Sequence, residues 1–527
     1  LPGSASMGGT SASPTYPSEA PHRELGARNP KLKTSVQAPT AGTTHYVTPS
    51  GTGDCSSWGN ACDLPTALAA VTSGDEVWVA QGTYTPGSGR TDTFTLTSGV
   101  AVYGGFIGSE SERSARDWSN NLTTLSGDIG VSGDAADNVH HVVYVTAGVT
   151  ETAVLDGFTI TGGYADAGWP DSAGGGVHNA GGSPTLRNLV IQHNHATSDG
   201  GAMYSASGRP TLGSVSVVSN TSNANGGGLS EGGGGFVLRD VSFRDNVADG
   251  YGGGLYNVGD SDLVNVVFER NTTKFSWGGG MATAGKTRLV NVAFYGNVAG
   301  EFGYDGGGLF NYGDATLINV VFSGNETVAG AGGGLYNDMC NPTLINVTSS
   351  GNQAASGGGA IHNNQSNVTV KNSIAWGNGG TQIQNASGTI TVTHSLVEGG
   401  WAGTGNLDAN PLFISSPDAG GDGEWGTDDD DYGSLALQAD SPAIDVGSNA
   451  AVPADALDLD QDGVLTETLP LDLGGGPRVA DGTVEMGAYE KSDWVDLRLD
   501  KRVETVPPGT PPGARPDEPL TYSLSFY

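Results

Sequence analysis

Two clusters of acidic residues near the C-terminal end of the sequence have the side chains and spacing that a calcium site requires. The first runs from Asp418 to Asp431, and the second runs from Asp458 to Gly463 with Glu467 close behind. Carboxylates at alternate positions ahead of a glycine turn can reach one hard cation together. Each cluster is therefore either a structural calcium site or a solvated acidic loop. The ligands that this spacing predicts are Asp418, Asp422, Asp428, Asp430, Asp458, Asp460, Asp462 and Glu467.

The second cluster departs from a complete EF-hand loop. The twelfth position counted from Asp458 is Leu469, where that loop requires a glutamate. Glu467 can take this role only if the chain follows a different path. No histidine lies close in sequence to either cluster, which disfavours a catalytic metal. Calcium in a structural role is the cofactor we expect.

Charged residues at matching positions of neighbouring segments are candidates for acid–base catalysis. Arg244-Asp245 and Glu269-Arg270 are such a set, and polysaccharide-cleaving enzymes use a cationic base or paired carboxylates. Stacking of the two segments would place opposite charges over each other at both positions. We therefore expect salt bridges here and predict no catalytic residue.

Aromatic residues in the same region could instead bind a ligand. Exposed rings stack on sugars or pack against a partner protein. The alternative is that the loops fold these rings onto the wall of the molecule, and the sequence leaves both open. The residues of this stripe are Tyr251, Phe275, Trp277, Phe302 and Tyr304.

All of these residues lie in or beside a repeat. Blocks of two or three glycines recur every 26 residues, with one interval of 28, and a second motif, Leu-x-Asn-Val-x-Phe-x-x-Asn, follows at a fixed distance. The blocks begin at Gly174, Gly200, Gly226, Gly252, Gly278, Gly306, Gly332 and Gly358. The closing asparagines are Asn194, Asn220, Asn246, Asn271, Asn297, Asn325, Asn352 and Asn378.

The repeat predicts an all-β fold. Side chains of Leu263 to Phe268 alternate along the sequence, which is typical of strands, and the unit has no room for a long helix. Such a unit cannot bury its inner face alone, but stacked copies can. We predict a parallel β-helix, a solenoid of about twelve coils with 26-residue repeats, followed by a C-terminal acidic cap.

Stacking also explains the choice of residues. Glycines supply positive φ at corners, and the asparagines can bond to one another up the column. Phe243, Phe268, Phe294 and Phe322 should form an interior ladder. His178 and His362 replace tyrosine or phenylalanine of other copies, so we expect them in a stacked column rather than in a metal site.

The paired motifs Gly-Gly-Ala/Gly-Ile/Leu and Phe-x-x-Asn resemble the repeats of polymorphic outer-membrane proteins and of the wider pectate-lyase-like β-helix group, over about residues 155–380. The opening from Tyr46 and the ending Glu485-Met-Gly-Ala-Tyr-Glu490 are similar to bacterial surface proteins of the choice-of-anchor class. The resemblance implies that the parallel β-helix is right-handed. It also implies an exported protein held at a cell surface.

The composition divides the chain into five parts. Residues 1–43 are a Pro/Ser/Ala-rich tail that we expect to be flexible, and residues 44–94 form an N-terminal cap. Cys55 and Cys62 bracket a short loop there and could close a local disulfide, which leaves Cys340 as a small buried residue. Residues 95–400 are the β-helix, and 401–491 are the acidic cap.

Residues 492–527 form a linker and two alternating strands, which are similar to the start of an Ig-like stalk domain. Two strands alone are marginal in water, so they either begin a longer domain or add to a sheet of another copy, head to tail. The strand residues that would serve polymerisation are Leu497, Leu499, Leu520, Tyr522, Leu524 and Phe526.

Charge and hydropathy restrict the partners. With 22 basic and 56 acidic residues the net charge is −34, which excludes nucleic acid as a partner. No apolar run is long enough to span a bilayer. The chain begins with Leu1, and we expect a processed, secreted protein at the cell surface.

Three functions fit these features. The first is a non-enzymatic structural or adhesive surface protein, with the capacity to form a filament from its own copies. The second is a polysaccharide lyase or glycoside hydrolase, which would require a groove holding two carboxylates, or a base beside calcium, without salt-bridge partners. The third is a carbohydrate-binding protein without catalysis, based on the aromatic stripe.

Overall fold

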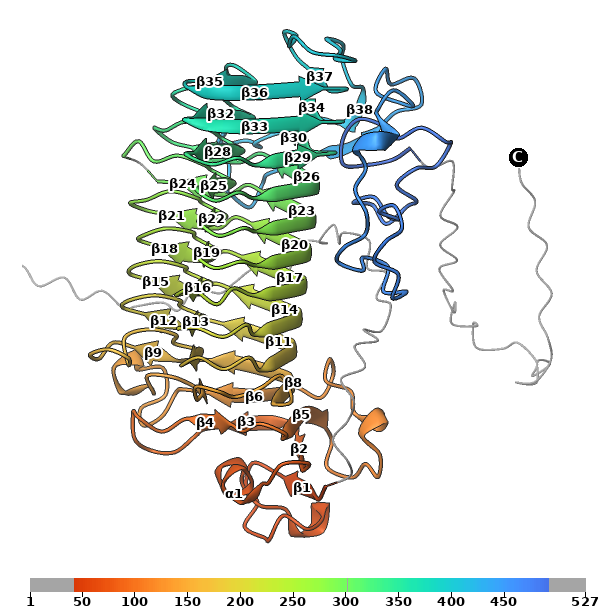
Figure 1. Ribbon diagram of the computed structural model, residues 1–527. Helices are drawn as coiled ribbons and strands as arrows, with labels where there is room; N and C mark the ends of the chain where they lie inside the picture. Colours follow the sequence, from red (N-terminus) through yellow and green to blue (C-terminus); the bar gives the residue numbers. More distant parts are fainter. Residues whose placement is uncertain (1–41, 301, 492–527) are drawn as a thin grey trace, which may run out of the picture. The chain divides into compact units, whose positions relative to one another are not determined.

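The computed structural model describes residues 42–300 and 302–491. They form a parallel β-solenoid of about twelve coils, which confirms the predicted fold class (Figure 1). Helices are few and short: α1 (Leu64–Ala70) and the 3₁₀ turns η1 (Trp58–Asn60), η2 (Arg113–Ala115), η3 (Ala135–Asp137) and η4 (Asn449–Ala451). None of the helices in these ranges is long and apolar enough to cross a membrane.

Sheet 1 has eighteen strands and forms one bent wall of the solenoid. Its strands pair in parallel, coil upon coil. They are β1 (Thr44–Val47), β2 (Glu76–Ala80), β3 (Gly82–Tyr84), β5 (Ala101–Phe106), β6 (Thr123–Ser126), β8 (Val154–Thr161), β11 (Thr185–Gln192), β14 (Thr211–Val218), β17 (Val237–Arg244), β20 (Asp262–Glu269), β23 (Arg288–Tyr295), β26 (Thr316–Ser323), β29 (Thr343–Ile345), β30 (Thr348–Ser350), β33 (Ser366–Lys371), β34 (Ile374–Ala375), β36 (Gly388–Thr393) and β37 (Leu396–Val397).

Sheets 2 and 3 close the coils on the other sides. Sheet 2 consists of β4 (Phe94–Leu96), β7 (Val143–Val145), β10 (Val177–Asn179), β13 (Met203–Ser205), β16 (Leu229–Glu231), β19 (Leu255–Asn257), β22 (Met281–Thr283), β25 (Leu309–Asn311), β28 (Leu335–Asp338), β32 (Ile361–Asn364) and β35 (Ile383–Asn385). Sheet 3 consists of β9 (Tyr164–Ala165), β12 (His195–Ala196), β15 (Thr221–Ser222), β18 (Val247–Ala248), β21 (Thr272–Thr273), β24 (Val298–Ala299), β27 (Glu326–Thr327) and β31 (Gln353–Ala354). A separate antiparallel pair is β38 (Phe413–Ser415) with β39 (Ser434–Leu437).

The long strands of sheet 1 bend in the middle, and this bend breaks the strict alternation that the sequence suggested. Asn265 adopts a left-handed backbone with φ +54°. As a result Leu263, Val266 and Phe268 all point into the core, whereas Val264 points outward. Asparagine tolerates this conformation better than other non-glycine residues, which explains its place in the motif.

The glycine blocks perform two tasks. The first glycine of a block, such as Gly252, has positive φ and turns the corner. The second allows close approach of the next coil, since a Cβ on Gly253 would lie 2.3 Å from the carbonyl oxygen of Gly279. The first position therefore favours glycine for its backbone conformation, and the second has no room for a Cβ atom.

Two ladders fill the interior as predicted. The rings of Phe243, Phe268, Phe294 and Phe322 stack with centroids 4.7 to 4.9 Å apart. The buried asparagines bond from coil to coil: the Nδ2 of Asn271 donates to the Oδ1 of Asn297 at 3.0 Å. The amides of this column, from Asn194 to Asn378, are thereby satisfied, as burial requires.

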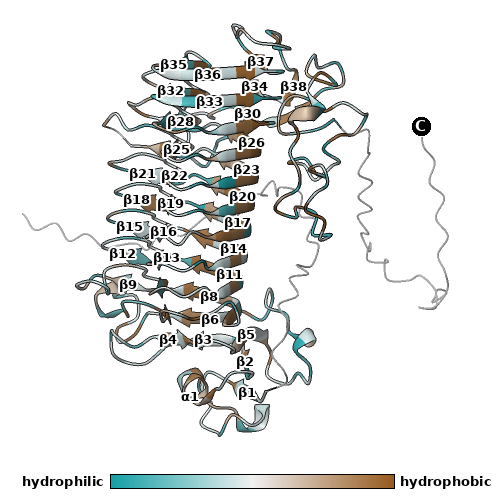
Figure 2. Cartoon of the chain, in the orientation of Figure 1, coloured by the Kyte–Doolittle hydropathy of each residue, from teal (hydrophilic) through white to brown (hydrophobic). Residues whose placement is uncertain are grey.

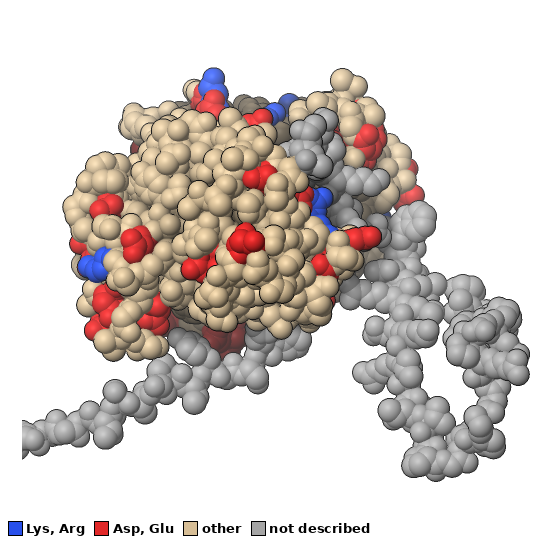
Figure 3. Space-filling view, turned by 90° about the horizontal axis from the view of Figure 1, so that it is seen from below, with Lys and Arg blue, Asp and Glu red and all other residues tan. Residues whose placement is uncertain are grey.

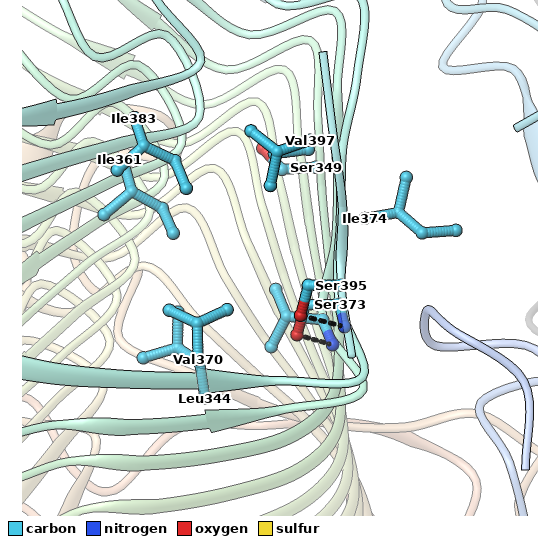
Figure 4. Close-up of a pocket in the computed structure, with 11 residues that line it drawn as sticks. Leu344, Ser349, Ile361, Val370, Ser373, Ile374, Ile383, Ser395 and Val397 are labelled. Atoms are coloured by element: carbon cyan, nitrogen blue, oxygen red, sulfur yellow. Dashed lines mark hydrogen bonds between the residues drawn. The ribbon is translucent and has the colours of Figure 1, made fainter. Parts of the chain in front are cut away.

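Beyond Phe322 the ladder continues with Ser349 and then Ala375. These smaller side chains leave an interior cavity of about 10 Å³, which can hold at most a water molecule (Figure 4). In the same view the Oγ of Ser395 accepts a bond from the backbone N–H of Ser373 at 3.0 Å, while Ile374 points away from the cavity.

The N-terminal end of the core is closed by α1. Its N-cap Asp63 accepts a hydrogen bond from the N–H of Thr66, and Leu64 and Ala67 are buried in the core. Cys55 and Cys62 form a disulfide nearby. Cys340 is a buried free thiol.

Residues 401–412 add to the last coil, where Leu407 pairs with Leu396. Residues 413–491 then return along the outer face of sheet 1, beside strands β17 to β37 (Figure 1). We call residues 413–491 the flank segment. It covers outward-facing apolar residues of the sheet, whose strands appear brown in Figure 2.

Side chains of sheet 1 hold the flank segment in register. The amides of Asn291, Asn319 and Asn346, all at the strand bend, donate to backbone carbonyls of the segment. Arg478 is fully buried, bonded to Glu490 and to the Oδ1 of Asn319. These hydrogen bonds therefore determine which coil of the solenoid lies against each part of the flank segment.

Candidate functional site

The outward face of sheet 2 carries a column of large side chains. In β19, Leu255 and Asn257 are buried whereas Tyr256 between them is partly exposed, so the middle residue points outward. Parallel pairing in register stacks these middle residues. From coil to coil they are Tyr144, His178, Tyr204, Ser230, Tyr256, Ala282, Phe310, Tyr336, His362 and Gln384.

A groove of about 430 Å³ opens where this column is interrupted by a small residue. Ala282 lies between Tyr256 and Phe310, and its methyl group leaves the space that a ring would fill. The volume is that of a small-ligand site. Its lining consists of Tyr251, Tyr256, Trp277, Ala282, Thr283, Ala284, Asp305, Phe310, Tyr312, Tyr336 and Asp338.

Trp277 organises one wall of the groove. Its ring stacks on Tyr251 at 5.2 Å and lies 5.6 Å from the ring of Phe310. Its indole N–H donates to the Oδ2 of Asp305 at 3.2 Å, which fixes the orientation of the ring. The groove is therefore preformed by contacts within the chain.

Two carboxylates give the groove its charge. Asp305 also accepts from the N–H of Ala331 at 2.8 Å, and Asp338 accepts from the Nδ2 of Asn364 at 2.9 Å. Burial raises the pKa of Asp305, and the charge of Asp338 adds to the rise. In the part of the chain that the structure describes, neither carboxylate has an ion-pair partner.

The charge around the groove is negative. Among the described residues that line it, none is a lysine or arginine. Acidic side chains also outnumber basic ones on the end of the molecule seen in Figure 3. A polyanionic ligand would be repelled, so the groove favours a neutral or cationic one.

The structure separates the five predicted aromatic residues. Tyr251 and Trp277 line the groove, and Tyr304 contacts Trp277 edge-on at 5.5 Å. Phe275 and Phe302 lie outside it on the corner loops and are 53% and 68% exposed. Part of the stripe is therefore folded onto the wall of the molecule and part is exposed, and binding by these rings stays a prediction.

Sequence reasoning missed the rings of Tyr256, Phe310, Tyr312 and Tyr336 as groove residues. Most were already recognised as members of a stacked column, which the structure confirms for His178 and His362. The feature of the sequence that could have indicated the groove is Ala282, which has no ring to fill the space between Tyr256 and Phe310. Burial lowers the pKa of both histidines, as expected for stacked, neutral rings.

The charged residues on sheet 1 include the ion pair between Asp245 and Arg270 that the sequence suggested. Arg270 binds Asp245 of the preceding coil at 2.8 Å and reaches Asp428 of the flank segment at 3.3 Å. Arg244 and Glu269 are in register, and Arg244 lies 3.6 Å from Asp245. These charges neutralise one another.

The two acidic clusters differ in how their carboxylates are used. In the first, Asp430 accepts from the N–H groups of Gly426 and Thr427, while Asp422 accepts from the N–H of Glu424. Asp418 pairs with Asp431 through the backbone, and Asp428 lies at the exposed surface. These carboxylates support turns of the loop.

In the second cluster carboxylates converge. Oxygen atoms of Asp458, Asp460 and Asp462 lie within 4.8 Å of one another, and the same holds for Asp455, Asp460 and Glu467. Asp455 was not among the predicted calcium ligands, because it lies before the repeated Asp-x-Asp pattern in the sequence. The structure brings it to the cluster through the pairing of Ala454 with Thr468.

The residues expected to serve polymerisation, Leu497, Leu499, Leu520, Tyr522, Leu524 and Phe526, lie outside the described residues, as does the partial Ig-like domain. The head-to-tail interaction therefore stays a prediction.

Comparison with known families agrees with the repeat. Residues 240–258 and 346–364 match the model of the Chlamydia polymorphic membrane protein (Chlamydia_PMP) repeat. The chain carries repeats of this type. Both matched segments contain the closing Asn of one coil and the glycine block that follows it.

Two solved structures are similar to parts of the chain. A pectate lyase, Pel9A, matches with a TM-score of 0.44 and 16% identity over 86% of this chain and 98% of its own. A pectin methylesterase from Aspergillus niger matches with a TM-score of 0.18 and 13% identity over 71% of this chain and 88% of its own. A search of curated protein sequences gave no match. At these levels the likenesses carry no functional argument.

Proposed function

We propose that this protein is a non-catalytic adhesive protein of the bacterial cell surface, and that its solenoid presents the aromatic groove on sheet 2 to a neutral glycan chain. The observation that carries the proposal is the preformed groove of aromatic faces around Ala282. The polymorphic-membrane-protein type of the repeats supports the surface location.

The geometry of a solenoid suits an extended polymer. Successive coils are spaced by about 4.8 Å, which is close to the length of one pyranose unit in an extended polysaccharide. Rings on successive strands of sheet 2 can therefore face successive sugars. The carboxylates of Asp305 and Asp338 can accept hydrogen bonds from sugar hydroxyls, and they disfavour uronic acids.

Calorimetry with the full chain tests this proposal. Cellohexaose and chitohexaose are the neutral probes, and hexagalacturonate is the anionic one. We expect a neutral probe to bind, and Trp277→Ala or Ala282→Trp to weaken that binding by about tenfold or more, equivalent to ~1.4 kcal/mol. Phe302→Ala is the control, because that ring is exposed outside the groove.

The proposal is wrong if the Trp277→Ala and Ala282→Trp proteins bind as tightly as the unmodified chain, or if only hexagalacturonate binds. Ala282→Trp should fold even if Trp277→Ala does not, because a ring at position 282 matches the rings of Tyr256 and Phe310 on either side of it. Its effect on binding can therefore be separated from an effect on folding.

A second candidate function, glycoside hydrolysis, is favoured by one observation. Asp305 and Asp338 share the groove, and the raised pKa of Asp305 suits a general acid. Release of reducing ends from cellohexaose or chitohexaose, abolished in Asp305→Asn, would establish this activity. Binding without any such release would favour adhesion.

The filament suggested by residues 492–527 is a separate part of the proposal. Electron microscopy of the isolated protein tests it, since regular fibres would support head-to-tail addition and dispersed single molecules would argue against it.

A further inference from the structure

The loop of residues 452–471 lies against the outer face of sheet 1. Leu459 and Leu469 pack with Val264, Val290 and Ile318 of three successive strands. Arg239 of β17 donates to the backbone carbonyls of Leu457 and Asp458. The loop is thus fixed on both sides of its acidic tip.

Folding of this loop places a carboxylate in an unfavourable position. Asp455 is completely buried, and only its Oδ2 has a partner, the N–H of Leu459 at 2.7 Å. Its Oδ1 has no hydrogen-bond partner in the described structure. Such a group costs considerable free energy unless a charge compensates it.

A second orphaned oxygen lies in the same cluster. The Oε1 of Glu467 is shielded from solvent and has no partner in the described residues. The N–H of Asp455 donates to the carbonyl of Glu467 at 2.9 Å, which holds the two residues opposite each other. Oxygens of both converge with one of Asp460, all within 4.8 Å.

The electrostatics of the cluster call for a cation. Carboxylate oxygens of five residues converge at the tip of the loop. The hydrogen bonds of Arg239 go to backbone carbonyls rather than to these carboxylates. Among the described residues, no lysine or arginine forms an ion pair with the cluster.

We infer that Asp455, Asp458, Asp460, Asp462 and Glu467 bind one calcium ion, which fastens the flank segment to the solenoid. All five ligands offer oxygen, and the ligand set contains neither histidine nor cysteine, which disfavours zinc. Several carboxylates from one loop suit calcium better than magnesium, which retains its waters.

The geometry also explains the departure from an EF-hand. Leu469, at the twelfth position, is buried in the apolar contact with sheet 1. Glu467 and Asp455 provide oxygens in its place, because the antiparallel pairing of Ala454 with Thr468 brings both to the tip.

Binding of calcium to the full chain tests the inference. After chelator treatment and dialysis, calorimetric titration with calcium chloride should show a site that magnesium chloride does not fill. Asp460→Asn, at an exposed position, should weaken this site by at least about tenfold, and so should Asp455→Asn. Asp422→Asn in the first cluster is the matched control.

A second readout follows the loop itself. Calcium should slow hydrogen exchange of residues 452–471 in the unmodified chain and in Asp422→Asn, but not in Asp460→Asn. The inference is overturned if the chain binds no calcium at millimolar concentration, or if binding is unchanged in Asp460→Asn and Asp455→Asn.

Discussion

Asparagine occupies three kinds of position in this solenoid, and each uses a different property of the side chain. Asn271 is fully buried and bonds to neighbouring coils on both sides, which requires a donor and an acceptor together. Asn265 is at the strand bend because it tolerates positive φ. Asn319 has the same bend and also donates to the flank segment.

The motif Leu-x-Asn-Val thus specifies a bend, and only the surroundings decide whether its amide also binds the flank segment. Where the segment is not in reach, the amide finds another partner, as Asn265 does with Asp240. A sequence pattern alone does not distinguish these cases.

The buried carboxyl group of Glu485 predicts how stability depends on pH. Burial raises its pKa to about 7, Asp445 adds to the rise, and Arg478 and Lys491 oppose it. The folded state then binds more protons than the unfolded state between pH 4.5 and 7. The contribution of Glu485 to stability should therefore rise as the pH falls through this window, by about 1 to 3 kcal/mol.

Urea unfolding at pH 7.5 and 5.5 measures this dependence, with a calcium chelator present at both values. Glu485→Gln should lose this contribution, because the amide does not titrate. Glu490, whose pKa burial also raises to about 7, and His178 and His362, whose pKa burial lowers, make stability depend on pH in both proteins, so the difference between the two slopes reports on Glu485. An unchanged slope in Glu485→Gln would contradict the prediction.

The strands, the ladders and the stacked coils could be predicted from sequence because a repeated residue has a repeated environment. The flank segment has no such period. Its partners, Val264, Val290 and Ile318, are outward residues of strands, and nothing local shows what covers them. The groove was likewise not predicted, since its signal is the absence of a ring at Ala282, between Tyr256 and Phe310 of the column.

Docking of the flank segment can be broken without breaking the solenoid. Val290 is buried between β23 and the segment, so Val290→Asp would place a charge in an apolar contact. We expect residues 413–491 to become sensitive to protease while the circular dichroism of the β-sheet is retained. Val190→Asp is the control, because Val190 faces outward on β11, outside the apolar cluster with residues 457–471.

If both variants were equally sensitive to protease, the substitutions would have disrupted the strands themselves and not only the docking surface. Protection of residues 413–491 in both variants would mean that the polar contacts of Arg478 and the bend asparagines are sufficient for docking.

Seen as a whole, residues 42–491 combine a modular part with a part of fixed length. Coils interact with their nearest neighbours, so their number can change without loss of the fold. The flank segment, in contrast, binds particular coils from Arg239 to Asn372 through separate polar contacts. The spacing between those coils must therefore match the spacing along the segment.

Deletion of one complete coil tests this difference, because its effect should depend on position. Removal of residues 200–225 joins Asp199 to Gly226, shortens the stack by one coil, and leaves every coil that contacts the flank segment in place. Removal of residues 278–305 joins Trp277 to Gly306 but takes β23 from the middle of the docking surface. Both proteins should keep their β-sheet circular dichroism.

Only the second deletion should release residues 413–491 to protease, because the contacts of Arg239 and Asn319 would then lie about 4.8 Å too close together. Equal protease resistance of the two proteins would show that the segment adjusts its path, and that the polar contacts do not set its register. Loss of folding in the first deletion would contradict the modular behaviour of the coils, since that deletion exchanges nearest-neighbour contacts and, beyond them, removes the ion pair of Arg209 with Asp262 two coils away.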